Sequence, residues 1–255
     1  MRMLLWAEWL KTKRSALRWL VVLLPALMGL VLAWYVAGRP WISAASAFSG
    51  FFSCWASLAL PFLAAIAAGQ LAAEEEGAGA FTGFLLSAKP RVQLYFGKLL
   101  LLFLLLAAAT LLATLVFCGG LWLGGYENTL LGFYVRAAIV CWLAILPLAA
   151  LHLWLAFAAG LGVSVGVGIG GGLVAALIGG TLLGDGIWPF VPWAWPLRLA
   201  MIHSVLQAAQ LNAEQLASLS SQSTLACILA MVGGIVVTAA SVWWFSRWEG
   251  RHSGE

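Results

Sequence analysis

Five long runs without a charged residue dominate the pattern of hydrophobic and polar positions along the chain. A helix needs about 20 apolar residues to cross roughly 30 Å of hydrocarbon, and each run reaches that length. The fourth run is long enough for two crossings, with a turn expected at Ala159–Gly162. The runs cover residues 19–38, 40–73, 99–126, 137–184 and 215–246. They predict an all-α integral membrane protein with six transmembrane helices, over residues 18–38, 48–73, 98–124, 134–159, 163–184 and 224–246.

Residues 1–17 predict an amphipathic helix ahead of the first crossing. Polar side chains recur at helical spacing on one face, and leucines and tryptophans recur on the other. This pattern is typical of a helix that lies in the membrane interface. A basic flank that only sets the topology is the alternative. The polar face comprises Glu8, Lys11, Thr12, Ser15 and Arg18, and the residues singled out for the interfacial helix are Glu8, Trp9, Lys11, Lys13 and Arg14.

A short loop, residues 74–97, separates the second and third predicted crossings and begins with three glutamates. Three carboxylates in hydrocarbon would cost on the order of 8 kcal/mol, so Glu74–Glu76 are expected in water. Gly77 and Gly79 follow and are expected to end the helix.

The rest of this loop predicts a short amphipathic helix. Phe81, Phe84 and Leu85 recur at i, i+3 and i+4, which places them on one face of a helix. Lys89-Pro90-Arg91 then turns the chain toward the third crossing. The apolar face needs a partner, and the bilayer surface or another protein would serve.

The stretch GIWPFVPWAWPLRLA lies in the longest predicted outer loop, residues 185–223. Its prolines prevent a regular spanning helix, and tryptophan prefers the membrane–water boundary. We therefore expect a broken, re-entrant or interfacial segment, followed by a short helix around residues 197–216. Simple interfacial anchoring is one interpretation, and an outer gate or substrate contact is the other. The residues assigned to the second are Pro192, Trp193, Trp195, Pro196 and Arg198.

The fifth predicted crossing is rich in glycine. Gly162, Gly166 and Gly170 form a small-xxx-small ladder, which lets membrane helices approach closely. A G-x-G-x-x-G match starts at Gly166, but no soluble strand precedes it and no acidic residue follows about 20 residues on. The pattern therefore favours a tight helix contact over a dinucleotide site, and leaves open whether that contact lies within the chain or between subunits.

Composition and charge support a membrane protein with both termini in the cytoplasm. The 255 residues are 64% hydrophobic and 9% charged, whereas soluble domains are roughly 45–50% apolar and about 25% charged. Cytoplasmic loops carry the excess of Lys and Arg, so the net charge of +4 fits an anionic inner leaflet rather than nucleic acid. The cytoplasmic cations would be Arg2, Lys11, Lys13, Arg14, Arg18, Lys89, Arg91, Lys98, Arg247 and Arg251, against Arg39, Arg136 and Arg198 outside.

The sequence contains no motif for an energy source or a catalytic centre. No G-x-x-x-x-G-K-[ST] loop and no H-E-x-x-H zinc motif occurs. His152 is the only ionisable residue near the middle of a predicted crossing, and such residues are candidates for function, although a hydrogen-bonded structural histidine is the alternative. Four separate cysteines lie in apolar segments, at no metal-ligand spacing. Together with the missing motifs, this leads us to expect no metal site, no bound cofactor and no catalytic residue in this chain.

The loop of residues 74–97 resembles that of type-2 ATP-binding-cassette (ABC) exporter permeases. The resemblance lies in an acidic patch, a glycine, Leu-Leu-Ser-x-x-Pro-Arg at residues 85–91, and Gly97-Lys98 at the next helix. It implies that this loop is the coupling loop, which docks on a separate ATPase subunit. The coupling residues it implies are Glu74, Glu75, Glu76, Gly77, Phe81, Phe84, Leu85, Lys89, Pro90 and Arg91.

Two further stretches resemble lantibiotic-immunity permeases: residues 8–15 with Pro25, and Pro-Trp-Ala-Trp-Pro-Leu-Arg at residues 192–198. The resemblance implies one permease domain over residues 1–255 in a bacterial plasma membrane. It implies two ATPase copies that bind ATP and Mg, and a second permease or a second copy of this chain. The substrate would be an amphipathic peptide expelled for self-immunity. An exporter of another drug, lipid or glycan, a non-transporting scaffold and a membrane enzyme are the alternatives.

Overall fold

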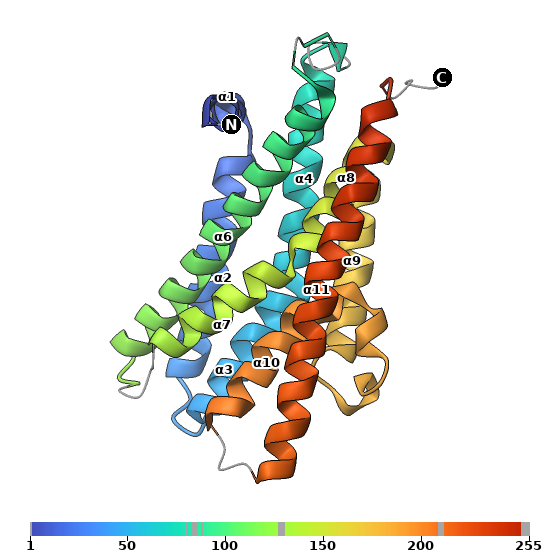
Figure 1. The fold of residues 1–255 in the computed structure, drawn as a ribbon. Coiled ribbons are helices and arrows are strands. Elements are labelled where there is room, and N and C mark those ends of the chain that lie inside the picture. Colours follow the sequence, from blue (N-terminus) through green and yellow to red (C-terminus); the bar gives the residue numbers. More distant parts are fainter. Residues whose placement is uncertain are drawn as a thin grey trace.

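The computed structural model describes residues 2–79, 81–82, 86–87, 89–126, 131–208 and 212–250. In this described part the regular secondary structure is helical, with no strand. The helices pack side by side into an elongated bundle (Figure 1). The N-terminal helix α1 (Arg2–Lys11), the end of α4 and the end of the last helix, α11, lie at one end of it (Figure 1). We call this the α1 end, and the other the opposite end.

Five helices in the described residues are long and apolar enough to cross a membrane, and the number rises to six if a bent pair of helices forms one span. The prediction of an all-α protein with several membrane-spanning helices is confirmed, and five to six candidate spans agree with the six predicted crossings. The orientation of the termini stays a prediction. The five are α2 (Leu17–Ala37), the joined helix α3–η2–α4 (Ala44–Gly77), α6 (Arg91–Leu123), α9 (Leu161–Ile178) and α11 (Ala213–Arg247). The bent pair is α7 (Leu131–Ala144) and α8 (Leu146–Ala159).

The fourth crossing and the last helix differ from their predicted bounds. The fourth crossing bends by 43° between α7 and α8, because Pro147 in the first turn of α8 cannot continue the preceding hydrogen-bond ladder. The last helix begins at Ala213 rather than at residue 224. A capping box starts it, in which Asn212 Oδ1 accepts from the Gln215 amide at 2.8 Å and Gln215 Oε1 accepts from the Asn212 amide at 3.2 Å.

The second crossing contains a π-helical turn. It runs through α3 (Ala44–Cys54), the turn η2 (Trp55–Ala59) and α4 (Leu60–Gly77). In the turn, the Leu60 amide donates to the Trp55 carbonyl five residues back. The Trp55 ring is fully buried, and its Nε1 donates to Thr110 Oγ1 of α6 at 3.3 Å. The irregular turn is therefore tied to the neighbouring helix inside the bundle.

Helix α4 lies at the centre of the bundle and packs against α8, α9 and α6. Its buried face carries small residues, among them Ala64, Ala65, Ala68 and Gly69. A Cβ atom at Gly69 would lie 2.8 Å from the side chain of Leu161 on α9. Small side chains let membrane helices approach closely, so α4 can be surrounded by other helices.

The close glycines of α9 are not those of the predicted ladder. A Cβ at Gly168 would lie 2.5 Å from the Ala65 Cβ, and one at Gly172 would lie 2.9 Å from the Ser57 carbonyl oxygen. By contrast, Gly162, Gly166 and Gly170 have nothing within 4 Å of a built Cβ. The contact within the chain therefore uses a different face of α9, and the predicted ladder faces open space.

We predict that Gly168→Val destabilises the bundle while Gly166→Val is tolerated. Valine at residue 168 would clash with α4, and overpacking of this kind costs about 1–3 kcal/mol. Residue 166 lies two positions away on the same helix with open space in front of it. The measurement is the thermal unfolding midpoint of each purified variant in detergent. Equal midpoints for the two variants would show that α9 does not pack on α4 through Gly168.

The opposite end contains a run of short 3₁₀ turns before the last two helices. The turns are Leu182–Gly184, Trp188–Phe190 and Pro192–Ala194, and α10 (Trp195–Ala208) follows. Helix α10 packs against α7, α11 and α3, and it lies beside them in Figure 1. The prolines at the start of each of the last two turns and in the first turn of α10 break the segment into these pieces.

Candidate functional site

A closed ring of four charged side chains joins three helices at the α1 end. Lys11 of α1 lies 3.0 Å from Glu8 of the same helix and 2.6 Å from Glu75 at the end of α4. Lys98 of α6 lies 2.7 Å from Glu75 and 2.6 Å from Glu8, which closes the ring. Positive and negative groups alternate around it. We call Glu8, Lys11, Glu75 and Lys98 the charge ring.

The charge ring is almost wholly buried. The side chains of Lys98, Glu8 and Glu75 are 0%, 2% and 6% exposed, and only Lys11 reaches the surface, at 44%. A buried charge is costly unless it is paired and hydrogen-bonded, and here each ammonium contacts two carboxylates. Burial lowers the pKa of Lys11, but its hydrogen bond to Glu75 and the negative charge of Glu8 raise it more, so the net shift is upward. Lys11 therefore stays charged at neutral pH.

This arrangement corrects two predictions made from the sequence. Glu75 lies among cations inside the protein rather than in water. The predicted polar face of α1 is likewise turned inward, since Glu8 and Thr12 are buried. The exposed side chains of this helix include Met3, Trp6 and Leu10. That apolar exposed face is what a helix in the membrane interface requires.

The turn between α1 and α2 holds α1 in place. Arg18 Nε donates to Thr12 Oγ1 at 3.0 Å, and its guanidinium carbon lies 4.0 Å from the centre of the Trp9 ring. Thr12 Oγ1 in turn donates to the Trp9 carbonyl at 2.8 Å. On the other side of α1, a Cβ at Gly97 would lie 2.7 Å from the Leu4 side chain, so the glycine leaves room for Leu4 to pack against α6. Gly97 therefore brings α1 close to α6, next to Lys98.

The end of α4 places a second acidic residue, Glu74, beside the ring. Glu74 has both carboxylate oxygens buried, and Ser15 and the charge of Lys98 act on its carboxyl group. The helix ends at Gly77, and Gly79 takes a left-handed φ of 117°. The Phe81 amide then donates to the Glu75 carbonyl at 3.1 Å, which closes the helix end. The expected helix-ending role of Gly77 and Gly79 agrees with this geometry.

Phe81 anchors the loop to the other side of the bundle. It is 1% exposed, and its ring centre lies 4.9 Å from that of Trp248 and 6.0 Å from that of Phe157. Arg91 Nη1 donates to the Trp248 carbonyl at 2.5 Å. The partner of Phe81 is therefore the chain itself, and not the bilayer or another protein as the sequence suggested. We call Phe81, Phe157, Phe245 and Trp248 the aromatic cluster.

Some of the predicted coupling residues lie at the surface, and others lie outside the described residues. Lys89 and Pro90 are exposed, and Leu86 is 79% exposed. Glu76 is half-buried. Phe84 and Leu85 lie outside the described residues, as does the side chain of Arg14, while Lys13 is exposed.

The predicted outer-gate residues are packed into the opposite end rather than displayed on it. A Cβ at Gly171 would lie 2.3 Å from the Trp193 indole, and one at Gly233 would lie 2.9 Å from the Trp195 ring. Trp195 Nε1 donates to the Pro189 carbonyl at 3.2 Å. Pro192 is half-buried and Pro196 is buried. Arg198 is paired with Asp185.

His152 lies in the interior of the bundle and has a hydrogen-bond partner. It is fully buried, and its Nδ1 lies 3.3 Å from Ser164 Oγ, which also donates to the Ala65 carbonyl at 3.0 Å. These contacts tie α8, α9 and α4 together. They agree with the structural interpretation of this histidine.

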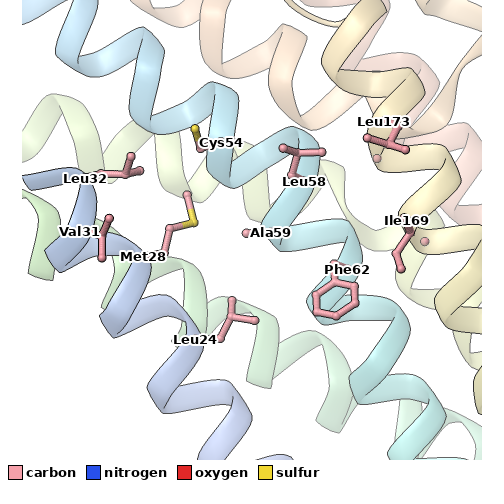
Figure 2. A pocket seen from close by; sticks show the side chains of 12 residues that line it. Leu24, Met28, Val31, Leu32, Cys54, Leu58, Ala59, Phe62, Ile169 and Leu173 are labelled. Carbon is pink, nitrogen blue, oxygen red and sulfur yellow. The ribbon is translucent and has the colours of Figure 1, made fainter. Parts of the chain in front are cut away.

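An apolar pocket of about 460 Å³ lies between α2, the second crossing and α9 (Figure 2). Met28 and Leu24 come from α2, Phe62 from α4 and Ile169 from α9, and their side chains surround the space in Figure 2. The lining includes Leu58 and Ala59 of the π-helical turn.

The sequence of the chain matches one family of membrane proteins. Residues 4–183 match the model of the family described as ABC-2 family transporter protein. The match covers more than half of the 255 residues. The chain belongs to the ABC-2 transporter family. Neither a curated protein nor a solved structure matches it.

Membership makes this ABC-2 permease the multi-pass membrane component of an ABC exporter, which associates with ATPase subunits. It is a transporter subunit and not itself the catalyst. The matched residues include all four members of the charge ring and the loop that follows α4. Lys98 and Trp248 were not predicted as site residues. The sequence feature that could have identified Lys98 is its position beside Gly97, directly before a long apolar run.

We predict that Lys98→Met lowers the free energy of unfolding of the permease by about 3–5 kcal/mol. The change leaves Glu8 and Glu75 buried with one cation fewer between them. Lys98→Met combined with Glu75→Gln should cost less than the single change, since it restores the balance of charge. Denaturant unfolding in detergent measures both. Lys89→Met removes an exposed lysine and should change stability by less than about 0.5 kcal/mol, so equal losses at residues 89 and 98 would contradict the prediction.

Proposed function

We propose that this ABC-2 permease expels an amphipathic peptide of the lantibiotic class from the membrane, for the immunity of the cell that makes it. Two copies of a partner ATPase, which bind ATP and Mg, would supply the energy. A second permease, or a second copy of this chain, would complete the pathway. The setting would be a bacterial plasma membrane, with the α1 end in the cytoplasm.

The charge ring is the observation that carries the coupling part of this proposal, because it joins the two elements proposed to contact the ATPase. The substrate part rests on the resemblance of residues 8–15 and 192–198 to lantibiotic-immunity permeases. Helix α1 contributes Glu8 and Lys11, and the end of α4, where the coupling loop begins, contributes Glu75. A push on the loop would reach α1 through these ion pairs. Lys98 would pass the same motion to α6.

The surface proposed to meet the ATPase lies between the charge ring and the aromatic cluster. Within the described part of the loop, Leu86 and Lys89 are exposed and available to a partner. Phe81 instead anchors the loop against Trp248, so motion of the loop would also reach α11. Phe84 and Leu85 remain proposed contact residues. The Trp-Pro segment of residues 192–198 remains the proposed outer gate, which would have to move against α9 and α11.

We predict that Leu86→Asp reduces the amount of ATPase that co-purifies with the permease roughly tenfold. Leu86 is exposed at the α1 end, so an aspartate there should leave the fold intact while disrupting an apolar contact. The measurement is a pull-down of the tagged permease in mild detergent from its native membrane, with the P-loop ATPase quantified. Leu216→Asp, at an exposed leucine near the start of α11, is the matched control.

The outcomes separate the proposed function from its alternatives. ATPase recovery with wild type and Leu216→Asp, but not with Leu86→Asp, supports the coupling loop. If no ATPase co-purifies with the wild-type permease, the coupling proposal is wrong and a non-transporting scaffold becomes the better interpretation. A sensitive host that gains no lantibiotic resistance from the complete set of subunits, while the ATPase still co-purifies, would point to a drug, lipid or glycan as substrate.

A further inference from the structure

The end of the bundle opposite α1 contains a second pocket, of about 400 Å³, whose lining differs from that of the apolar pocket. It lies between the end of α9, the loop at Asp185, α10 and α11. Polar side chains come from Thr181, Asp185, Arg198 and Gln222, and apolar ones from Met201, Ile202 and Leu219. A site with both characters fits an amphiphile better than a fully soluble ion.

Arg198 is the cation of this pocket, and only some of its N–H groups donate hydrogen bonds to the described residues. Its Nη2 donates to Asp185 and to Gln222 Oε1, the latter at 3.4 Å. Its Nε is buried and has no hydrogen-bond acceptor among the described residues. A guanidinium has five N–H donors in a planar fork that matches phosphate or carboxylate oxygens. Arg198 therefore has donors to spare for an oxyanion.

The guanidinium of Arg198 is largely buried, whereas its counter-ion, Asp185, lies at the surface. The Arg198 side chain is 15% exposed, and its guanidinium carbon lies 5.6 Å from the centre of the Trp188 ring. Asp185 is 54% exposed and precedes Gly186, which has a left-handed φ of 86°. An ion pair with one exposed partner is screened by water, so an oxyanion that enters the pocket could take the guanidinium and release Asp185 to water.

We propose that this pocket binds the phosphate head group of an anionic phospholipid in the leaflet opposite the α1 end. The pocket lies just beyond Ile178, where the apolar span of α9 ends, and this is the depth of the lipid head groups. Met201, Ile202 and Leu219 would contact the glycerol and the first methylenes of the lipid. Asp185 acts as an internal competitor for Arg198.

The test uses the purified full-length permease in detergent, titrated with phosphatidylglycerol and followed by native mass spectrometry. Arg198→Gln should weaken binding roughly tenfold, because a charge-assisted contact is lost. Asp185→Asn should tighten binding roughly two- to fivefold, because the competitor is neutralised. Arg136→Gln is the matched control, since it removes an exposed arginine from the start of α7 at the same end.

Each result supports or overturns the assignment. Weaker binding with Arg198→Gln, tighter binding with Asp185→Asn and no change with Arg136→Gln support it. Equal losses from both arginine variants would show non-specific attraction. Weaker binding of phosphatidylglycerol with Asp185→Asn would show that Asp185 does not compete with the lipid for Arg198, and would overturn the assignment. If inorganic phosphate binds to the permease and phosphatidylglycerol does not, the ligand is not a lipid. If Arg198→Gln does not fold, the Asp185→Asn variant still tests the proposal, because the proposal requires that this change strengthen the binding of phosphatidylglycerol.

Discussion

A ring of two lysines and two glutamates holds together three helices that would otherwise meet mainly through apolar surface. In a membrane, apolar contacts between helices give little net gain, because lipid is as apolar as leucine. Charge pairs in a low-dielectric setting are strong and depend steeply on geometry. The ring therefore sets how α1, α4 and α6 lie relative to one another, and the loop after α4 inherits its position from it.

The loop is fixed from two directions by different kinds of contact. On one side Glu75 is held by ion pairs, and on the other Phe81 is held by packing against Trp248 and Phe157. Arg91, at the start of α6, adds a hydrogen bond to the backbone carbonyl of Trp248. The first and last helices of the chain are thus both joined to this one loop. A subunit that docks there would act on the whole α1 end and not on a single helix.

The sequence was a good guide to which segments span the membrane, and a poor guide to which faces meet. Apolar length alone located the five to six candidate spans, because it depends on the solvent and not on partners. The same reasoning treated each glutamate of residues 74–76 as an isolated charge, and so missed that Lys11 and Lys98 lie beside Glu75. The glycine ladder shows the same limit, because its spacing left open whether the contact lies within the chain or between subunits. Its spacing identified a small-residue stripe, but only the packed structure shows that Gly168 faces α4.

The π-helical turn at Trp55–Ala59 has a consequence for the charge ring, although it lies in the middle of the second crossing. A π turn accommodates one residue more than an α turn, and one residue corresponds to about 100° of rotation in an α-helix. If this turn were regular, α4 would be rotated by about that angle relative to α3. Glu75 would then point away from Lys11 and Lys98. A single extra residue at mid-membrane thus selects the direction in which a carboxylate faces at the far end of the helix.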